Sequence, residues 1–160
     1  MPQDHNRSLL RSATLSDLRE VGSWIRSKRE CELWAGRRLG FPIDHGSLPT
    51  AIGFADGNAF SLAIHEDLVA FGQLIGKNSR RGHLARLIVN PASRGRGYGR
   101  ALVRTLLDKA RGSSFERVSL NVDIANVAAV SLYTKLGFVD MKKPPDEPGG
   151  FESRYMEMLI

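Results

Sequence analysis

Residues 89–102 place glycines at a point where an apolar strand is expected to end and a helix to begin. Gly95, Gly97 and Gly99 let the backbone approach a bulky group closely and adopt conformations that other residues resist. The first amide N–H groups of a helix point outward, at the positive end of the helix dipole. This combination predicts a cradle for a phosphate group.

Arginines surround the same helix start. Each cation in the first turn of a helix is normally unfavourable by about 0.3–1 kcal/mol, yet Arg94, Arg96 and Arg100 crowd this turn. A bound anion would reverse the sign of that interaction. The alternative is a solvated face, because Arg96, Arg100 and Arg104 have i, i+4 spacing, but that interpretation leaves the glycines unexplained.

Two common phosphate-binding motifs do not fit the segment. A nucleotide-hydrolysing P-loop needs Gly-Lys-Ser/Thr after its glycines, whereas this chain has Gly99-Arg100-Ala101. A dinucleotide-binding turn needs Gly-x-Gly-x-x-Gly within a parallel sheet, whereas Gly95, Gly97 and Gly99 are spaced two and two. The predicted anion is therefore neither the nucleotide of a P-loop nor a dinucleotide.

The net charge of +6 on 160 residues raises the alternative of nucleic-acid binding. Residues 80–111 carry nine basic residues and one acidic residue, so this segment is +8 and the remainder is −2. Only Tyr98 is aromatic within it, and a single-strand platform interleaves several aromatics with its basic residues. The charge therefore indicates one local anionic ligand and no nucleic-acid partner.

Composition and length indicate one domain over residues 1–160. No apolar run approaches the ~20 residues needed to cross a bilayer, and residues 1–7 lack the apolar core of a signal peptide. Cys31 is the sole cysteine, so an internal disulfide is excluded. We expect a cytoplasmic protein that does not bind membranes.

The pattern of apolar residues and turn signals predicts a mixed α/β fold of the α+β kind, with a mixed sheet. An antiparallel meander comes first, and a β-α-β-α-β portion follows. The expected strands are residues 9–13, 60–65, 69–76, 83–89, 117–122, 138–141 and 155–159. The expected helices are 15–25, a short one around Cys31, 97–110 and 126–136, and residues 42–59 are expected to be mostly loop.

Two motifs of this chain resemble those of the GNAT superfamily of acyl-CoA-dependent N-acetyltransferases. Arg94-x-x-Gly97-x-Gly99 resembles the acyl-CoA pyrophosphate motif, and Asn126-x-x-Ala129-x-x-Leu132-Tyr133-x-x-Leu136-Gly137-Phe138 resembles the second signature. They lie about 30 residues apart, as in the family. The resemblance covers residues 83–141, and residues 1–60 match only in the order of their elements. It implies a GNAT-like fold.

The resemblance implies acetyl-CoA as cosubstrate, without a metal, and direct transfer to a primary amine in a ternary complex. Leu87 to Val89 would hold the pantetheine by their backbone, and an amide near Leu87 or Val89 would polarise the thioester carbonyl. Asn126 would contact the cofactor arm or cap a helix, two compatible roles. The implied cofactor-binding residues are Leu87, Ile88, Val89, Arg94, Gly95, Arg96, Gly97, Tyr98, Gly99, Arg100, Ala101 and Asn126.

The resemblance also implies a proton donor and a proton acceptor. Tyr133 would donate to the departing CoA thiolate, the alternative being a core tyrosine beside Leu132. The strand before the turn lacks the carboxylate that many relatives use as base, and His83 stands near that position. By strand alternation His83 would share a face with Ala85, Leu87 and Val89. The alternatives are an ordinary strand histidine, or Glu66, Glu30 or Glu32 as base.

The acceptor is expected to be a small-molecule or peptide amine. Family pockets imply walls from residues 24–44 and 142–154, where Glu30, Glu32 and Asp44 could hold a cationic amine. A cysteine nucleophile is the less favoured mechanism, because Cys31 is distant from both motifs in sequence. A non-catalytic acyl-CoA-binding or regulatory module is the alternative function, and a homodimer through the last strand is possible.

Overall fold

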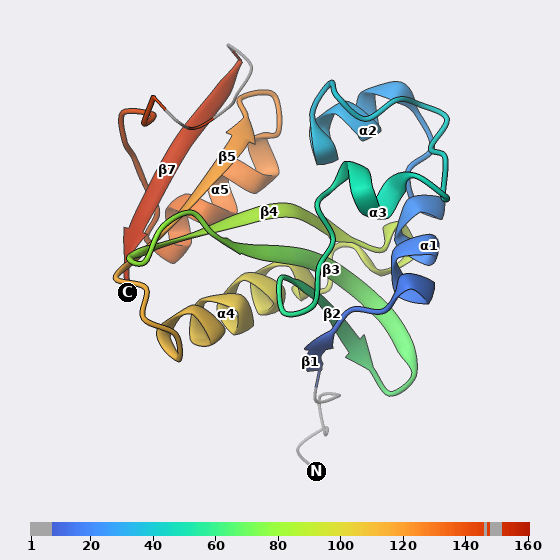
Figure 1. The fold of residues 1–160 in the computed structure, drawn as a ribbon, viewed down its shortest axis with the longest axis horizontal. Coiled ribbons are helices and arrows are strands. Elements are labelled where there is room, and N and C mark those ends of the chain that lie inside the picture. Colours follow the sequence, from blue (N-terminus) through green and yellow to red (C-terminus); the bar gives the residue numbers. More distant parts are fainter. Residues whose placement is uncertain (1–7, 146, 148–151) are drawn as a thin grey trace.

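The computed structural model describes residues 8–145, 147 and 152–160. One seven-stranded sheet, in the order β1-β2-β3-β4-β5-β7-β6, runs through these residues (Figure 1). The strands are β1 (Leu9–Ser12), β2 (Ala59–Ile64), β3 (Asp67–Gly76), β4 (Arg81–Val89), β5 (Arg117–Asp123), β6 (Val139–Asp140) and β7 (Ser153–Leu159). The helices are α1 (Leu15–Ser23), α2 (Lys28–Ala35), α3 (Leu48–Ala51), α4 (Tyr98–Arg111) and α5 (Val127–Leu136).

The expected mixed fold is confirmed. Strands β1 to β4 pair antiparallel in sequence order, and β4 then pairs in parallel with β5. Strand β7 inserts between β5 and β6, antiparallel to both. The crossover from β4 to β5 through α4 carries the glycine-rich segment at its start.

The first helix is shorter than expected, and a short helix lies within the segment that was expected to be mostly loop. Helix α1 ends at Ser23, with Trp24 as its C-cap, so the predicted extension to residue 25 was too long. A one-turn helix, α3, lies within residues 42–59, which were expected to be mostly loop. Pro49 occupies the first turn of α3, where proline needs no N–H partner.

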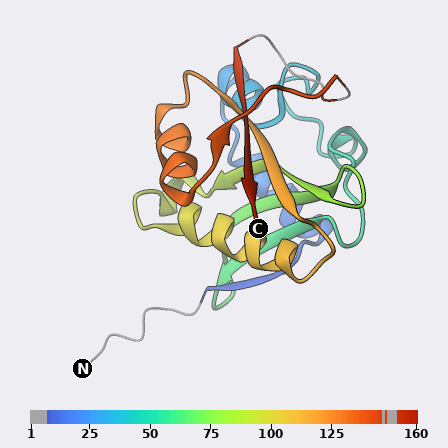
Figure 2. The same cartoon turned by 90° about the vertical axis from the view of Figure 1, so that its left-hand side faces the viewer.

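Helices cover both faces of the sheet (Figures 1 and 2). One core cluster packs α4 and α5 against the strands, with Leu102, Leu106 and Leu84 among its buried residues. The other packs α1, α2 and α3 against the opposite face, around Phe71 and Trp34. A sheet buried on both faces supports a site only where strand ends or gaps open it.

Strand β4 contains a bulge at Arg86 and Leu87. Phe71 pairs with Ile88 and Gln73 with Ala85, so two residues of β4 lie opposite Gly72 alone. Arg86 has a φ of 52°, in the left-handed region. A Cβ on Gly72 would lie 2.5 Å from Cδ2 of Leu87, so the glycine makes room for the bulge.

The bulge corrects the predicted face of the strand. Strict alternation placed His83 and Leu87 on one face, whereas Leu87 packs with Leu84 against the α4 side. His83 instead contacts Ser119 on the neighbouring strand. The extra residue shifts the alternation by one position, and that shift moves Leu87 to the other face.

Strands β4 and β5 separate along their length. Their pairing runs from Arg81 opposite Arg117 to Leu84 opposite Leu120 and ends there. β4 continues to Val89 and β5 to Asp123, so the later residues of both strands lack each other as partners. A gap therefore opens at the carboxyl ends of two parallel strands, which is where α/β sheets commonly bind ligands.

No helix among the described residues is long and apolar enough to cross a membrane.

Candidate active site

A small cavity of about 60 Å³ lies where β4 and β5 separate. Residues of α2, β4, β5 and the start of α5 line it, and Tyr133 contributes from within α5. The lining residues are Leu33, Trp34, Leu84, Ala85, Arg86, Leu87, Leu120, Asn121, Val122, Asp123, Asn126 and Tyr133. The cavity therefore joins the strand gap to the helix that carries the predicted proton donor.

Tyr133 combines burial with a hydroxyl that is not otherwise engaged. The side chain is 8% exposed, and its ring meets Phe138 edge-on at 6.0 Å between centroids. The hydroxyl has no hydrogen-bond partner among the described residues. Burial raises the pKa of Tyr133 to about 12, so the phenol remains protonated at neutral pH. A protonated phenol facing a cavity is suited to donate a hydrogen bond to a developing anion.

The strand residues predicted to hold the pantetheine lie beside this cavity. Leu87 lines it, while Ile88 packs toward the α1–α3 side and Val89 toward the α4 side. All three follow the last β4–β5 pair, so no strand pairs with them on the β5 side. Their backbone is placed to accept an extended ligand as an added strand.

The glycine-rich turn joins β4 to α4. The side chain of Asn90 accepts a hydrogen bond from the Ala92 amide and caps a short 3-10 helix, Pro91–Ser93. Gly95 and Gly97 then adopt φ values of 78° and 84°, in the left-handed region. Gly97 is the N-cap of α4 without a side-chain cap, so the first amides of α4 receive no side-chain oxygen from it. These amides are available to an anion.

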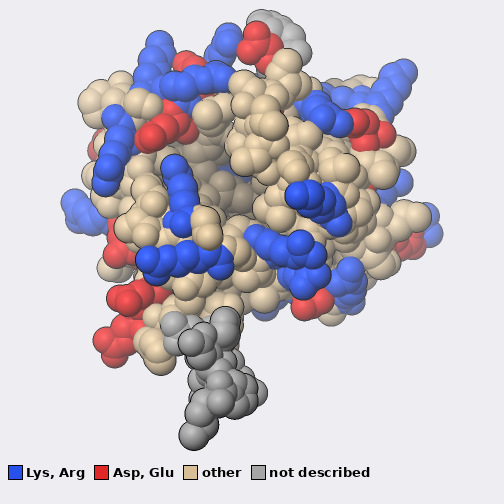
Figure 3. Space-filling model, turned by 180° about the vertical axis from the view of Figure 1, so that it is seen from behind, with Lys and Arg blue, Asp and Glu red and all other residues tan. Residues whose placement is uncertain are grey.

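Three exposed arginines surround this turn. Arg94, Arg96 and Arg100 form no ion pair with any described carboxylate. Figure 3 shows Lys and Arg side chains gathered around a recess on the back of the molecule. Unpaired cations beside free helix amides favour a ligand with several negative charges.

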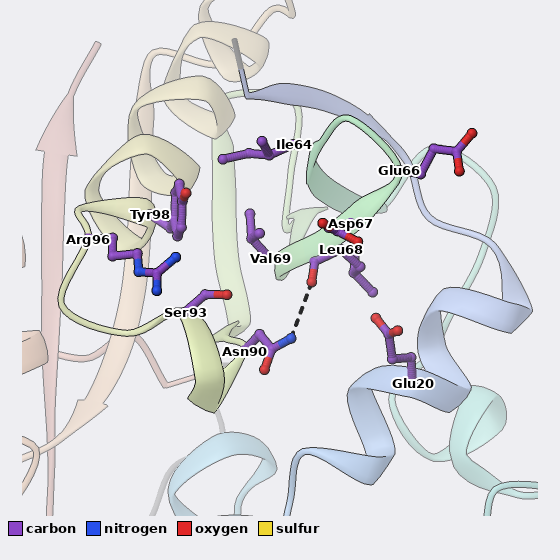
Figure 4. A pocket seen from close by; sticks show the side chains of 10 residues that line it. All are labelled: Glu20, Ile64, Glu66, Asp67, Leu68, Val69, Asn90, Ser93, Arg96 and Tyr98. Carbon is purple, nitrogen blue, oxygen red and sulfur yellow. Dashed lines mark hydrogen bonds between the residues drawn. The ribbon is translucent and has the colours of Figure 1, made fainter. Parts of the chain in front are cut away.

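A larger cavity of about 310 Å³ lies on the flank of the turn (Figure 4). Arg96 and Tyr98 reach it from the turn, and the carboxylates of Glu20 and Asp67 reach it from the opposite side. Burial raises the pKa of Glu20, and the charges of Asp17 and Asp67 add to the effect. Tyr133 does not line this cavity, so the smaller cavity is the better candidate for chemistry.

Asn126 caps helix α5, which is one of its two predicted roles. Its side chain accepts a hydrogen bond from the Ala129 amide at 3.3 Å, so it caps α5. It also lines the cavity that contains Tyr133. Helix α5 ends at Leu136, and its C-cap is Gly137 with a φ of 108°, in agreement with the expected stop.

His83 belongs to a buried polar cluster rather than to the cavity lining. Its Nδ1 lies 2.7 Å from the Ser119 hydroxyl, and its Nε2 lies 3.4 Å from Glu147 Oε1. Burial lowers the pKa of His83 to about 3, aided by the positive charges of Lys77, Arg81 and Arg86. The imidazole is therefore neutral at pH 7, with both nitrogens engaged, and it is a weak base.

The other candidate acids and the cysteine lie elsewhere. Glu30 Oε2 accepts a hydrogen bond from the Arg26 amide, and Asp44 Oδ1 accepts one from the Gly46 amide. Glu66 lies at the β2–β3 turn beside the larger cavity. Cys31 is fully buried, and burial raises the pKa of its thiol, so it lacks the properties of a reactive thiolate. Glu32 does not line either cavity.

Several residues around the site were not anticipated from the sequence. Arg86, Asn121 and Asp123 line the cavity, and Glu147 lies in the polar cluster. Trp34 also lines the cavity, and it lies within the predicted pocket wall of residues 24–44. The sequence signal for Arg86 is a charged residue inside an otherwise apolar strand. Glu147 lies in the predicted pocket-edge loop, of which Asp146 and residues 148–151 are outside the described residues.

Among the described residues, no group of three or more His, Cys, Asp or Glu side chains is arranged to hold a metal ion.

Comparison with known proteins defines the class to which this fold and site belong. The acetyltransferase (GNAT) family matches residues 23–138, more than half of the chain. The chain belongs to the GNAT acetyltransferase family. The matched region includes the glycine-rich turn, the separated strands and Tyr133.

Individual relatives and structures are similar over different extents. An uncharacterised N-acetyltransferase, YobR of Bacillus subtilis, is 37% identical over 79 residues, covering 49% of this chain and 32% of YobR. Mycothiol acetyltransferase of Thermobispora bispora is 32% identical over 132 residues, covering 81% of this chain and 40% of that protein. The chain thus matches well under two thirds of the length of these curated relatives.

Solved structures share the fold over nearly the whole chain. Spermidine N-acetyltransferase of Vibrio cholerae, solved with CoA and spermine, has a TM-score of 0.72 at 22% identity, covering 96% of this chain and 95% of that one. The ribosomal-protein-S18-alanine N-acetyltransferase of Escherichia coli has a TM-score of 0.67 at 22% identity, with coverages of 96% and 94%. At this level of identity the likeness concerns the fold.

Proposed function

We propose that this chain transfers an acetyl group from acetyl-CoA to a primary amine by direct attack in a ternary complex, as one domain over residues 1–160. The observation that carries the proposal is the cavity between β4 and β5, which Tyr133 lines together with residues that follow the last β4–β5 pair at Leu84. The glycine-rich turn lies at the end of the same strand β4. One ligand could therefore extend from the turn to Tyr133.

The residues divide the work of binding and chemistry. The amides after Gly97, with Arg94, Arg96 and Arg100, would hold the pyrophosphate and 3′-phosphate. The backbone of Leu87 to Val89 would hold the pantetheine, and an amide there would stabilise the oxyanion of the tetrahedral intermediate. Tyr133, protonated at neutral pH, would donate to the departing thiolate. No metal is assigned a role.

The amine must lose a proton before it attacks. His83 is neutral and so able to accept one, but its pKa of about 3 makes it weak for this task. In this mechanism the amine proton passes to solvent, and His83 accepts it only through a bridging water molecule. The test is the pH profile of kcat/KM in a His83→Gln variant, in which an unchanged profile removes His83 from the reaction.

Purified protein incubated with acetyl-CoA and a panel of primary amines should release CoA and form acetylated amine. Tyr133→Phe should lower kcat about 100-fold while leaving the Kd for acetyl-CoA unchanged. Tyr155→Phe is the matched control, because it removes a phenol hydroxyl that contacts Arg81 and Glu157 outside the cavity. Binding of acetyl-CoA without turnover of any amine would favour the non-catalytic module instead.

A further inference from the structure

Two residues that line the small cavity each have a buried polar atom with no hydrogen-bond partner among the described residues. These atoms are Nε of Arg86, a donor, and Oδ1 of Asn121, an acceptor. Both residues line the cavity that contains Tyr133. Since buried polar atoms in native proteins are nearly always hydrogen-bonded, each atom calls for a specific explanation.

The Arg86 guanidinium is held in place by neutral groups. Nη1 donates to Gln73 Oε1 at 2.8 Å, and the Gln73 amide in turn donates to the Ile52 carbonyl. The backbone carbonyl of Arg86 accepts a hydrogen bond from Trp34 Nε1 at 2.9 Å. The side chain of Arg86 is thus anchored to Gln73 on β3, and its backbone is anchored to Trp34 on α2.

The charge of Arg86 lacks a counter-ion. No described carboxylate lies within ion-pair distance of it, and burial lowers its pKa with no opposing contribution from an acid. A partly buried guanidinium is costly unless an anion compensates it. The bulge also holds Arg86 at a φ of 52°, a conformation that glycine would adopt with less strain. The chain therefore has an arginine at a position whose backbone conformation favours glycine.

The acids nearest the cavity are already engaged. Asp123 lines the cavity, and its Oδ1 lies 3.7 Å from the guanidinium of Arg29. Glu147 contacts Lys77 and Arg81, and its Oε1 accepts from Nδ2 of Asn121 at 3.4 Å. That last contact leaves Asn121 Oδ1 as an acceptor. The unsatisfied groups are thus one cationic donor and one neutral acceptor.

Resting on the function proposed above, we propose that the acceptor is an amine that also carries an oxyanion, either a carboxylate or a phosphate. The amine donates to Asn121 Oδ1, and the oxyanion accepts from the Arg86 guanidinium. An unsubstituted polyamine complements neither the free positive charge nor the engaged acids. Arg86 is then the residue that selects the acceptor.

The test uses acceptor pairs that differ only in the oxyanion, at saturating acetyl-CoA. One arm compares amino acids with their decarboxylated amines, a second compares amino sugars with their phosphate esters, and spermidine is included. The wild-type protein should show kcat/KM at least about 10-fold higher for the oxyanion-bearing member of one arm. The arm that responds distinguishes carboxylate from phosphate.

Arg86→Met should raise KM for the oxyanion-bearing member of a pair more than for its oxyanion-free partner, so that the ratio of kcat/KM within the pair falls, and Arg86→Lys should restore part of that ratio. Arg19→Met on the exposed face of α1 is the matched control. Equal rates within every pair, or a preference for spermidine, would overturn the inference while leaving the proposed function standing. Equal losses for both members of a pair in Arg86→Met would also overturn it. If no amine is acetylated, the proposed function and the inference fail together. The comparison on wild-type protein remains decisive even where a variant does not fold.

Discussion

Glu147 Oε2 lies 3.3 Å from Nη2 of Arg81, and both side chains are only 2% exposed. The same carboxylate contacts Lys77 and His83, so one acid from the loop before β7 faces three basic side chains of β4 and the preceding turn. Glu147 therefore binds the sheet through a buried ion pair, on the same face of the sheet as Gln73 and Asn121. Removal of the Glu147 charge should affect stability more than any surface ion pair.

Glu147→Gln should lower the free energy of unfolding by about 3 kcal/mol, because it removes the acidic partner of the buried Arg81–Glu147 ion pair. Urea denaturation at pH 7 measures the change. Glu152→Gln is the control, since Glu152 is exposed and belongs to the same loop, and it should change stability by less than about 0.5 kcal/mol. Equal stabilities of the two variants would contradict the structural role of Glu147.

Stability should fall in mildly acidic solution because of His83. Its pKa is about 3 in the folded chain and near 6.5 when unfolded, so the unfolded chain binds the extra proton. The free energy of unfolding is therefore unaffected by His83 above pH 6.5. It falls as the pH decreases from 6.5 toward 3, with a slope of up to about 1.4 kcal/mol per pH unit. Denaturation between pH 7 and pH 4.5 measures this slope.

His83→Gln should flatten the dependence within that window. Asp17 does not interfere there, because the hydrogen bonds from Arg11, Thr14 and Ser61 outweigh burial and hold its pKa at about 2. Its contribution is lost only below its unfolded value near 4. An unchanged slope in His83→Gln would show that another group carries the effect.

Gly97→Ala should weaken acetyl-CoA binding more than it destabilises the fold. A Cβ there meets no atom within 4 Å, but the φ of 84° strains any residue other than glycine by about 1–2 kcal/mol. The methyl group also lies where the proposed pyrophosphate must approach. We expect at least about a tenfold rise in Kd, measured by calorimetry.

Gly53→Ala provides the matched control for that change. Gly53 has a φ of 60°, and a Cβ added to it would meet no atom within 4 Å, yet it lies between α3 and β2, outside both cavities. Its stability loss should match that of Gly97→Ala without any change in Kd. A similar rise in Kd in both variants would mean that strain alone weakens binding.

Gly72→Ala should disturb the bulge and lower kcat. The new Cβ would lie 2.5 Å from Cδ2 of Leu87 and 3.1 Å from Cδ1 of Leu106, so Leu87 must shift. Overpacking of this kind costs about 1–3 kcal/mol, and the shift displaces the cavity wall. Steady-state kinetics and thermal unfolding report the two effects.

Two further variants separate the bulge from general strain in β3. Gly76→Ala brings a Cβ only to 3.4 Å from Phe115 and should retain kcat. Gly72→Ala combined with Leu87→Ala should recover part of the lost activity, because the clash is removed. Failure of the double variant to recover would place the defect elsewhere than at Leu87.

The sequence predicted the parts of the site that depend on local backbone chemistry. The glycine-rich turn required left-handed residues, and Gly95 and Gly97 adopt that conformation. Asn126 and Gly137 begin and end α5 as their residue types indicated. Such features arise within a few residues of the chain, so the residue types alone carry them.

Features that depend on distant contacts were not predictable in the same way. The bulge at Arg86 arises from the register of β3 against β4, and strict alternation misplaced Leu87 as a result. Glu147 meets Arg81 across 66 positions of sequence, through a loop whose composition indicated only turns. Arg86 and Asn121 become neighbours of one cavity only after β4 and β5 lie side by side.

Only four residue pairs join β4 to β5, and they are the direct strand pairing between the β1–β4 part of the sheet and the β5–β7–β6 part. The sheet therefore has a seam, closed at Arg81 and open beyond Leu84. An extended ligand bound between the open ends of β4 and β5 would contact both parts of the sheet and hold them together. Amide protons of residues 85–89 and 121–123 should then exchange with solvent more slowly when acetyl-CoA is bound. The cosubstrate would in that case also stabilise the sheet for as long as it stays bound.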